Sequence, residues 1–215
     1  MIDASTLQFI TEHLEDDVRT LSLQGSKYKH IDFKQALVQI AGRQKIKDKL
    51  PSWYSRFDLL LPLQLPLEQC SSEATARYKA SLAKGDTLID LTGGWGVDCA
   101  FMAPNFTKVL YFEQQQSLCE IAKYNFRQLG LTHIETQAKE STKQIASFPT
   151  ASCIYIDPSR RDTHGKKTVL LRDCTPNIAD IAPALLEKTE GLLVKLSPML
   201  DISQAIKELP QTTEV

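Results

Sequence analysis

The sequence predicts an α/β fold, a Rossmann-like, doubly wound and mostly parallel sheet that follows an N-terminal all-helical region. After residue 86, short apolar runs alternate with helical segments, which is typical of βαβ units. Before residue 60, apolar residues recur at helical spacing without strand-like alternation. A glycine-rich stretch also separates the first expected strand from its helix. We therefore expect a helical region over 1–60, a connector and helix over 61–85, and a sheet domain over 86–215.

Apolar residues recur at spacings of three and four in the first helical stretch: Leu7, Ile10, Leu14, Val18 and Leu21. We expect Ser5 or Thr6 to cap that helix. A second helix is expected from Asp32, as N-cap, to a stop at Lys49-Leu50-Pro51. The proline-containing stretch after residue 60 is expected to be extended, and a third helix to run from Glu68 to Leu82.

The sheet domain is expected to contain five strands, at Thr87–Leu91, Lys108–Phe112, Ile134–Gln137, Ser152–Ile156 and Leu192–Lys195. Helices are expected between and after them, at Val97–Ala103, Gln116–Leu129, Ser141–Ser147, Pro176–Glu187 and Ser203–Glu208. Right-handed crossovers would make this a doubly wound sheet. Residues 212–215 look like the start of another strand, so we expect a sheet that is C-terminally truncated and lacks its last strands.

Composition excludes several classes of protein. The chain of 215 residues is 42% hydrophobic and 24% charged, close to an average globular protein and unlike a disordered one. No apolar run reaches the roughly 18 residues of a membrane helix, and the acidic N-terminus lacks a signal peptide, so a cytoplasmic protein with no membrane partner is expected. The 5 cysteines show no CxxC pair, so no zinc or other metal site is expected. Nothing in the sequence indicates an oligomeric state.

The segment from Leu88 to Asp98, LIDLTGGWGVD, is an apolar strand that ends in an acid, turns through glycines and opens a helix. Glycines accept positive φ and let a ligand approach the backbone, and doubly wound sheets bind nucleotides at such turns. The dinucleotide pattern GxGxxG is incomplete because Cys99 stands where it needs glycine, and no P-loop lysine is present. The alternative is a tight turn that binds nothing.

Asp90, Gly94 and Gly96 fit the pattern Asp-x-x-x-Gly-x-Gly, which resembles the first motif of class I S-adenosylmethionine-dependent methyltransferases. The resemblance implies S-adenosylmethionine as cofactor. The cofactor-binding residues that it implies in this stretch are Asp90, Thr92, Gly93, Gly94, Gly96 and Asp98.

Three further residues, Glu113, Gln114 and Glu140, complete the expected cofactor site. Glu113, followed by Gln114, ends the second expected strand about 20 residues after the glycines, where an acid accepts hydrogen bonds from ribose hydroxyls. A solvent-exposed glutamate is the alternative. Glu140, after the third strand, stands where the superfamily often has an acid that contacts the adenine amine, so the resemblance implies that role for it.

The fourth expected strand leads into Asp157-Pro158-Ser159-Arg160-Arg161. This is similar to the Asp/Asn-Pro-Pro-aromatic motif of enzymes that methylate exocyclic amines of nucleobases, in which the acid accepts a hydrogen bond from the target amine. Ser159 and Arg160 replace the second proline and the aromatic residue, although an arginine can stack on a base or bind phosphate. The resemblance makes Asp157, Pro158, Ser159 and Arg160 the catalytic residues. A proline turn with two exposed arginines is the alternative.

Basic residues are clustered in two places although the net charge is −1. Residues 160–172 hold five Lys or Arg against one Asp, and this stretch suits a polyanionic substrate. Residues 27–49 hold seven Lys or Arg against two Asp, which would add a basic surface or simply a solvated face. The expected substrate-binding residues are Arg160, Arg161, Lys166, Lys167, Arg172 and, after the fifth strand, Lys195.

Three phrases in order, QIAGRQK with KLP, LEQCSSEATA and DPSRR, resemble a bacterial family of class I methyltransferases known as THUMP-like. The resemblance covers residues 1–210 and implies methylation of a base in tRNA or rRNA. The DLTGGWGVD stretch alone also looks like the glycine motif of a ribosomal-RNA guanine methyltransferase. Two alternatives stay open: a degenerate fold that binds RNA without methylating it, and a methyltransferase for a small molecule or a protein.

Overall fold

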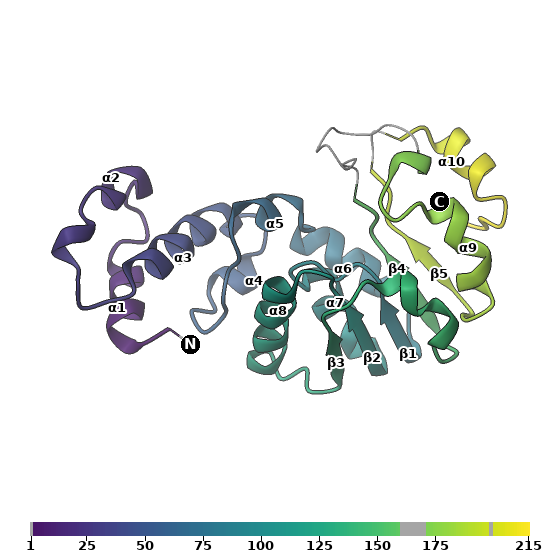
Figure 1. The fold of residues 1–215 in the computed structure, drawn as a ribbon, viewed down its shortest axis with the longest axis horizontal. Coiled ribbons are helices and arrows are strands. Elements are labelled where there is room, and N and C mark those ends of the chain that lie inside the picture. The colour runs from purple at the N-terminus through teal and green to yellow at the C-terminus, as the bar shows by residue number, and fades with distance from the viewer. Residues whose placement is uncertain (1, 160–170, 198–199) are drawn as a thin grey trace.

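The computed structural model describes residues 2–159, 171–197 and 200–215 (Figure 1). Within these residues the sheet has five strands, all paired in parallel, in the order β3-β2-β1-β4-β5. The strands are β1 (Gly85–Asp90), β2 (Phe106–Phe112), β3 (Ile134–Gln137), β4 (Cys153–Ile156) and β5 (Leu192–Val194). The predicted α/β class and parallel sheet are confirmed.

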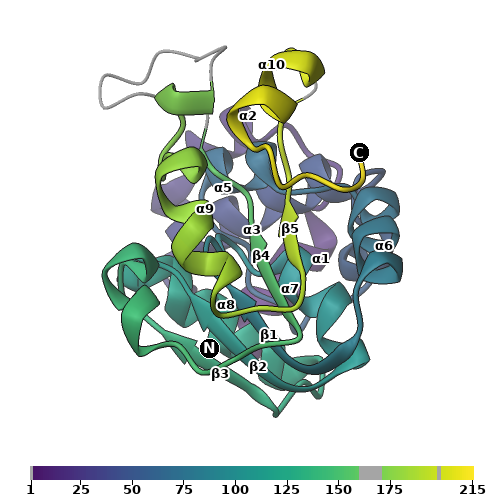
Figure 2. The same cartoon turned by 90° about the vertical axis from the view of Figure 1, so that its right-hand side faces the viewer.

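Helices cover both faces of this sheet because neighbouring strand residues point to opposite sides. One face packs on the N-terminal helices, α7 (Val97–Met102) and α8 (Gln116–Gln128). The other face packs on the 3-10 segment η3 (Ser141–Ser147) and on α9 (Ile178–Leu186). Figure 2 shows α9 beside β4 and β5, with the N-terminal helices behind. The remaining elements of this domain are η2 (Ala103–Asn105), η4 (Leu171–Asp173) and α10 (Ile202–Glu208).

The strand order reverses between β1 and β4, since the chain runs outward from β1 through β2 to β3 and then returns to β4 on the other side. Doubly wound sheets bind ligands outside the carboxyl ends of the strands at such a switch point. The segments that follow Asp90 and Ile156 are therefore the ones that a ligand would meet.

The N-terminal region forms an arm of helices beside the sheet domain (Figure 1). Its elements are α1 (Ala4–Glu12), α2 (Val18–Ser22), η1 (Gly25–Lys27), α3 (Phe33–Ile46), α4 (Pro51–Tyr54), α5 (Gln64–Gln69) and α6 (Glu73–Leu82). Asp32 caps α3 as predicted, accepting the Gln35 N–H.

Two helix predictions were wrong in detail. The first expected helix is divided in two, since Asp3 caps α1 and a second aspartate, Asp17, caps α2 by accepting the Thr20 N–H. The third expected helix is also divided, because α5 begins earlier and contains Pro66, and Ser72 then caps a new start at α6. Side chains that satisfy exposed helix N–H groups decide where a helix begins, even inside a continuous apolar pattern.

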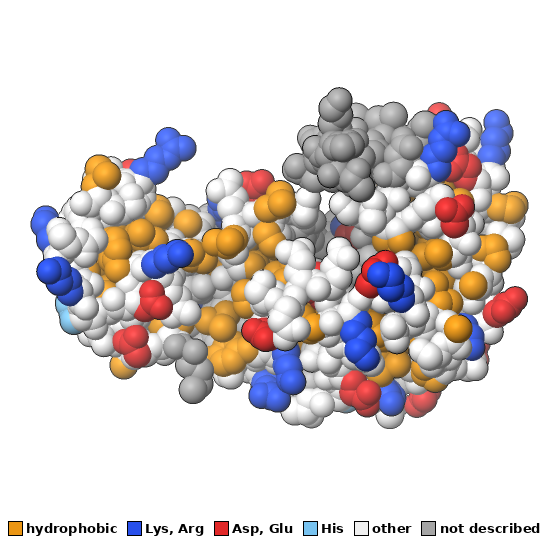
Figure 3. Space-filling model, in the orientation of Figure 1, with side chains coloured by type: hydrophobic (Ala, Val, Ile, Leu, Met, Phe, Trp, Pro, Cys, Tyr) orange, Lys and Arg blue, Asp and Glu red, His pale blue; other side chains and the backbone are white. Residues whose placement is uncertain are grey.

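The expected basic surface over residues 27–49 is only partly formed. Arg43 is fully buried and donates hydrogen bonds to the carbonyls of Tyr54, Arg56 and Leu59, so it fastens the loop after α4 onto α3. Lys45 and Lys47 form ion pairs with glutamates elsewhere in the arm. On the face shown in Figure 3, basic and acidic side chains are interspersed.

The arm is attached to the sheet domain at Leu60. Asn125 of α8 accepts the Leu60 N–H at 2.8 Å and donates to the Leu60 carbonyl at 2.8 Å. Trp95, from the glycine turn, donates to the same carbonyl at 3.2 Å. Its ring lies 4.9 Å from that of Trp53 in α4, edge to face. The arm therefore buries one side of the turn that follows β1.

Candidate functional site

The glycine turn joins β1 to α7, and the requirement for glycine differs among its three glycines. A Cβ on Gly93 would lie 1.9 Å from the Tyr111 ring, and one on Gly96 would lie 2.6 Å from the Phe126 ring. Gly94 has φ +58°, yet a Cβ there would meet only the Thr92 carbonyl, at 3.9 Å. Internal packing thus excludes side chains at two positions, whereas no described side chain comes within contact distance of a Cβ on Gly94, which leaves room for a ligand.

Asp90, at the end of β1, has an unsatisfied buried oxygen. Its side chain is 1% exposed, and Oδ1 accepts the Thr92 N–H at 3.1 Å. Oδ2 is buried and has no hydrogen-bond partner among the described residues. Burial raises the pKa of Asp90 from 3.8 to about 8. A buried acceptor without a donor is costly, so this oxygen suits a ligand that brings a donor or a positive charge.

Glu113, just after β2, reaches across to the glycine turn. Its Oε2 accepts the Gly94 N–H at 2.9 Å and its Oε1 accepts the Gln115 N–H at 2.7 Å. Burial raises the pKa of Glu113, and these backbone N–H groups oppose that rise. Each carboxylate oxygen can accept a further hydrogen bond, so the oriented group can still receive hydroxyl donors. Gln114, beside it, is exposed.

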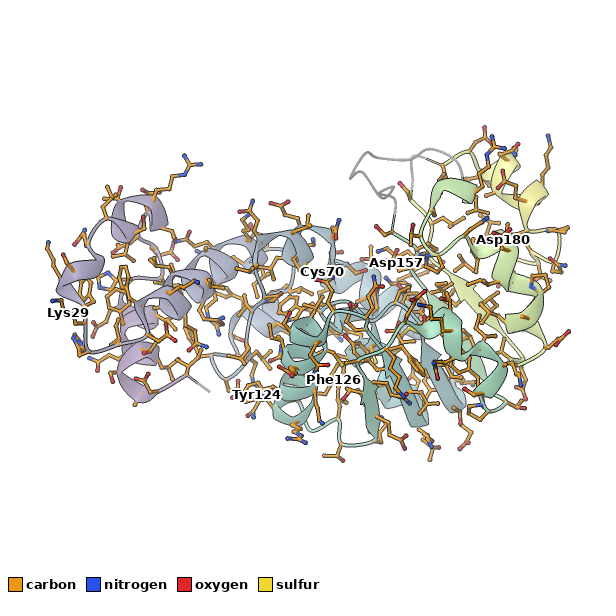
Figure 4. The ribbon with its side chains drawn as sticks, in the orientation of Figure 1. Lys29, Cys70, Tyr124, Phe126, Asp157 and Asp180 are labelled. Atoms are coloured by element: carbon orange, nitrogen blue, oxygen red, sulfur yellow. The ribbon has the colours of Figure 1, made fainter. Side chains whose placement is uncertain are left out.

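Asp157, just after β4, is held from both neighbouring strands. Its backbone N–H donates to the Thr92 Oγ1 at 2.7 Å, on the β1 side. Its Oδ2 forms an ion pair with the Lys195 Nζ at 2.5 Å, on the β5 side. Burial raises the pKa of Asp157, and the charge of Lys195 opposes that rise. In Figure 4, Asp157 is labelled in the same part of the view as Cys70 of the arm.

Asp98, in the first turn of α7, belongs to a buried polar cluster that the sequence did not reveal. Its Oδ2 accepts from the Lys79 Nζ at 2.6 Å, the Tyr155 hydroxyl at 2.7 Å and the Ser71 Oγ at 2.9 Å. Lys79 is only 7% exposed. Lys79 lies three residues after the fully buried Ala76 and so on the same face of α6, but the burial of that face is known only from the structure.

The other predicted site residues are spread more widely. Pro158 is buried, and Ser159 is exposed and forms a bridge with Thr175 through backbone hydrogen bonds of 2.8 and 2.9 Å. Glu140 forms a surface ion pair with Lys143 at 2.6 Å. Arg172 is exposed in η4. The predicted residues Arg160, Arg161, Lys166 and Lys167 lie outside the described residues.

The structure therefore brings one set of predicted residues to the carboxyl ends of neighbouring strands: Asp90, Thr92, Gly94, Glu113, Asp157 and Lys195. In the described part of the chain, no group of three His, Cys, Asp or Glu side chains could hold a metal ion. None of the described helices is long and apolar enough to cross a membrane.

The fold is similar to that of solved proteins. A crystal structure of a "putative methyltransferase" from Porphyromonas gingivalis W83 matches 94% of the chain with a TM-score of 0.73 and 25% identity. The chain has the Rossmann-like fold of class I methyltransferases. It spans about half of the P. gingivalis protein, 51% of that chain.

A second solved structure with a similar fold is named for a different reaction. Precorrin 8w decarboxylase from Methanobacterium thermoautotrophicum matches with a TM-score of 0.52 and 13% identity, over 66% of this chain and 72% of that one. One fold can serve different reactions, so the residues of the site have to support any activity. No protein-family model matches the sequence, and no curated protein matches it.

Proposed function

We propose that the protein is an S-adenosylmethionine-dependent methyltransferase that acts on a base in tRNA or rRNA. The observation that carries the cofactor is the glycine turn, where a Cβ on Gly94 would meet only the Thr92 carbonyl among the described residues and where Glu113 accepts the Gly94 N–H. The unpartnered Oδ2 of Asp90 lies at the start of that turn, and Glu113 holds its middle. The similarity to the P. gingivalis protein supports the same activity.

The cofactor supplies an electrophilic methyl group on a sulfonium. In this proposal Asp90 accepts a hydrogen bond from the amino group of its methionine part, and Glu113 accepts those of the ribose hydroxyls. Gly94 leaves room for the ligand beside the backbone. Gln114 and Glu140 lie on the adenine side in the same proposal, although Glu140 must then leave its surface pair with Lys143.

Asp157 serves the substrate. In the proposed reaction its carboxylate would accept the hydrogen bond of the target amine and receive the proton that the amine loses when its nitrogen bonds the methyl carbon, the sulfur–methyl bond breaks and the sulfur leaves as a neutral thioether. Such a transfer depends on positioning more than on a strong base. The buried Pro158 fixes the chain after Asp157. Residues 160–172, with five Lys or Arg against one Asp, support a polyanionic substrate.

The cofactor site is tested by calorimetric titration with S-adenosylhomocysteine. We expect micromolar binding by the wild type and an affinity at least about tenfold lower for Glu113→Gln. The glutamine amide replaces one of the two acceptor oxygens by an NH2 donor. Glu135→Gln is the matched control, because Glu135 is exposed and pairs with Lys108 at the far side of the sheet. A folded wild type that binds neither S-adenosylhomocysteine nor S-adenosylmethionine would refute the proposal.

The substrate is tested by transfer of a tritiated methyl group to unmodified tRNA and rRNA. Incorporation by the wild type that Asp157→Ala abolishes would support RNA methylation. RNA binding that falls steeply with salt, but without incorporation, would favour the RNA-binding module. Cofactor binding without RNA affinity, unchanged by alanine at Arg160 and Arg161, would favour a small-molecule or protein substrate.

A further inference from the structure

We propose that Lys195 is a positioning residue for Asp157, which it keeps ionised and turned toward β5 so that Asp157 can accept the substrate proton. The inference rests on the proposed methyl transfer and deepens it. The sequence suggested that Lys195 binds substrate, and in the structure its ammonium pairs with the Asp157 carboxylate.

The pairing follows from the register of the sheet. Ile156 of β4 lies beside Val194 of β5, so the next residues along the parallel strands are Asp157 and Lys195. The Lys195 N–H donates to the Ile156 carbonyl at 2.9 Å, which continues the ladder for one residue beyond the strands. The two side chains thus leave the same edge of the sheet as cross-strand neighbours, with Nζ and Oδ2 2.5 Å apart.

Lys195 is the cation in direct contact with Asp157 among the described residues. Lys79 of α6 also acts on Asp157 through its charge, but its ammonium is bound to Asp98 at 2.6 Å. Asp98 of α7 is the acidic group that acts on Asp157, and Asp157 in turn acts on the buried Asp90 of β1. Burial and the charge of Asp98 favour a neutral Asp157, and the charges of Lys195 and Lys79 oppose them. A neutral carboxyl would present a donor and could not accept the proton.

The backbone of Asp157 is fixed independently, through the hydrogen bond from its N–H to the Thr92 Oγ1. Loss of the Lys195 ammonium should therefore change the charge and direction of the carboxylate without moving the chain. The expected signature is a lower turnover with an unchanged KM for substrate, because the pair holds the proton acceptor rather than the substrate phosphates.

The first test is a carbon-detected NMR titration of protein labelled with 13C at the aspartate carboxyls, with the Asp157 signal assigned from Asp157→Asn. In Lys195→Met the Asp157 carboxyl should titrate about one pH unit or more above the wild type, since an opposite charge in contact lowers a carboxyl pKa by that much. Lys195→Arg should restore most of the difference. Lys143→Met, which removes a lysine from a surface pair, should leave the Asp157 signal unchanged.

An Asp157 titration that is the same in Lys195→Met and the wild type would overturn the inference. Methyl transfer gives a second reading: Lys195→Met should lose turnover near neutral pH and recover it as the pH rises and Asp157 ionises. A loss that stays constant with pH would also overturn it. S-adenosylhomocysteine titration separates the two proposals, since a wild type that binds no cofactor refutes the function while the NMR titration still decides what Lys195 does.

Discussion

Replacing Asp90 by asparagine should stabilise the free protein at neutral pH and weaken cofactor binding. Burial raises the pKa of Asp90 from 3.8 to about 8, so between these values the folded state holds a proton that the unfolded state has released. The free energy of unfolding of the wild type therefore falls as pH rises through that window. At about 1.4 kcal/mol per pH unit, the Asp90 contribution between pH 5 and pH 7 is about 3 kcal/mol. Asparagine does not ionise and removes this contribution.

The assay is urea denaturation of wild type and Asp90→Asn at several pH values from 5 to 8. The difference in unfolding free energy should widen by about 3 kcal/mol in favour of the variant between pH 5 and pH 7. Asp86→Asn is a matched control, because Asp86 lies on the same strand and is exposed. The comparison isolates Asp90, since Glu113 and Asp157 are present in all three proteins. Parallel pH curves for wild type and Asp90→Asn would refute the assigned burial of an unpaired carboxyl.

Three further outcomes are expected. Gly94→Ala should cost about 1 kcal/mol for its positive φ and reduce S-adenosylhomocysteine affinity at least tenfold, whereas Gly96→Ala, whose Cβ would lie 2.6 Å from an aromatic ring, should mainly lower the thermal unfolding temperature. Lys79→Met should cost about 3 to 5 kcal/mol in urea denaturation because it strands the buried Asp98 carboxylate, and adding Asp98→Leu should recover much of the loss; an additive double variant would contradict the pairing. Arg43→Met should lower the free energy of unfolding by about 3 kcal/mol, because it leaves three carbonyls without their donor. If Arg43→Met were as stable as the wild type but bound RNA more weakly, this structural role for Arg43 would be contradicted.

The sheet could be predicted because buried parallel strands read as continuous apolar runs. The strand expected at Thr87–Leu91 is Gly85–Asp90 in the structure, and the one expected at Ser152–Ile156 is Cys153–Ile156. The grouping of Asp90 and Asp157 could also be predicted, because both lie at the carboxyl ends of parallel strands and those ends share one edge of the sheet. The register then sets which of them are neighbours, as it does for Asp157 and Lys195.

Polar contacts between distant segments could not be predicted. Arg43 and Lys79 stand among other charged residues in helices, and nothing in their local sequence says that they are buried. Each bonds to groups in other segments: Arg43 donates to the carbonyls of Tyr54, Arg56 and Leu59, and Lys79 pairs with Asp98. Helical periodicity describes one element at a time, whereas the burial of a charge depends on the partner that a second element supplies. The expected basic surface over residues 27–49 was overestimated for this reason.

The attachment at Leu60 limits how this chain can be divided or recombined. Cutting the chain after the helical arm would leave Asn125 and Trp95 with polar groups that have lost their partner, and would bare the indole ring that packs on Trp53. Each abandoned buried group costs about 1 to 3 kcal/mol, a large share of the stability of a domain. A helical arm grafted from another protein would have to reproduce the backbone geometry of Leu60 beside the glycine turn. The arm and the turn are therefore expected to be inherited together, as one unit of evolution, although they lie in different parts of the sequence.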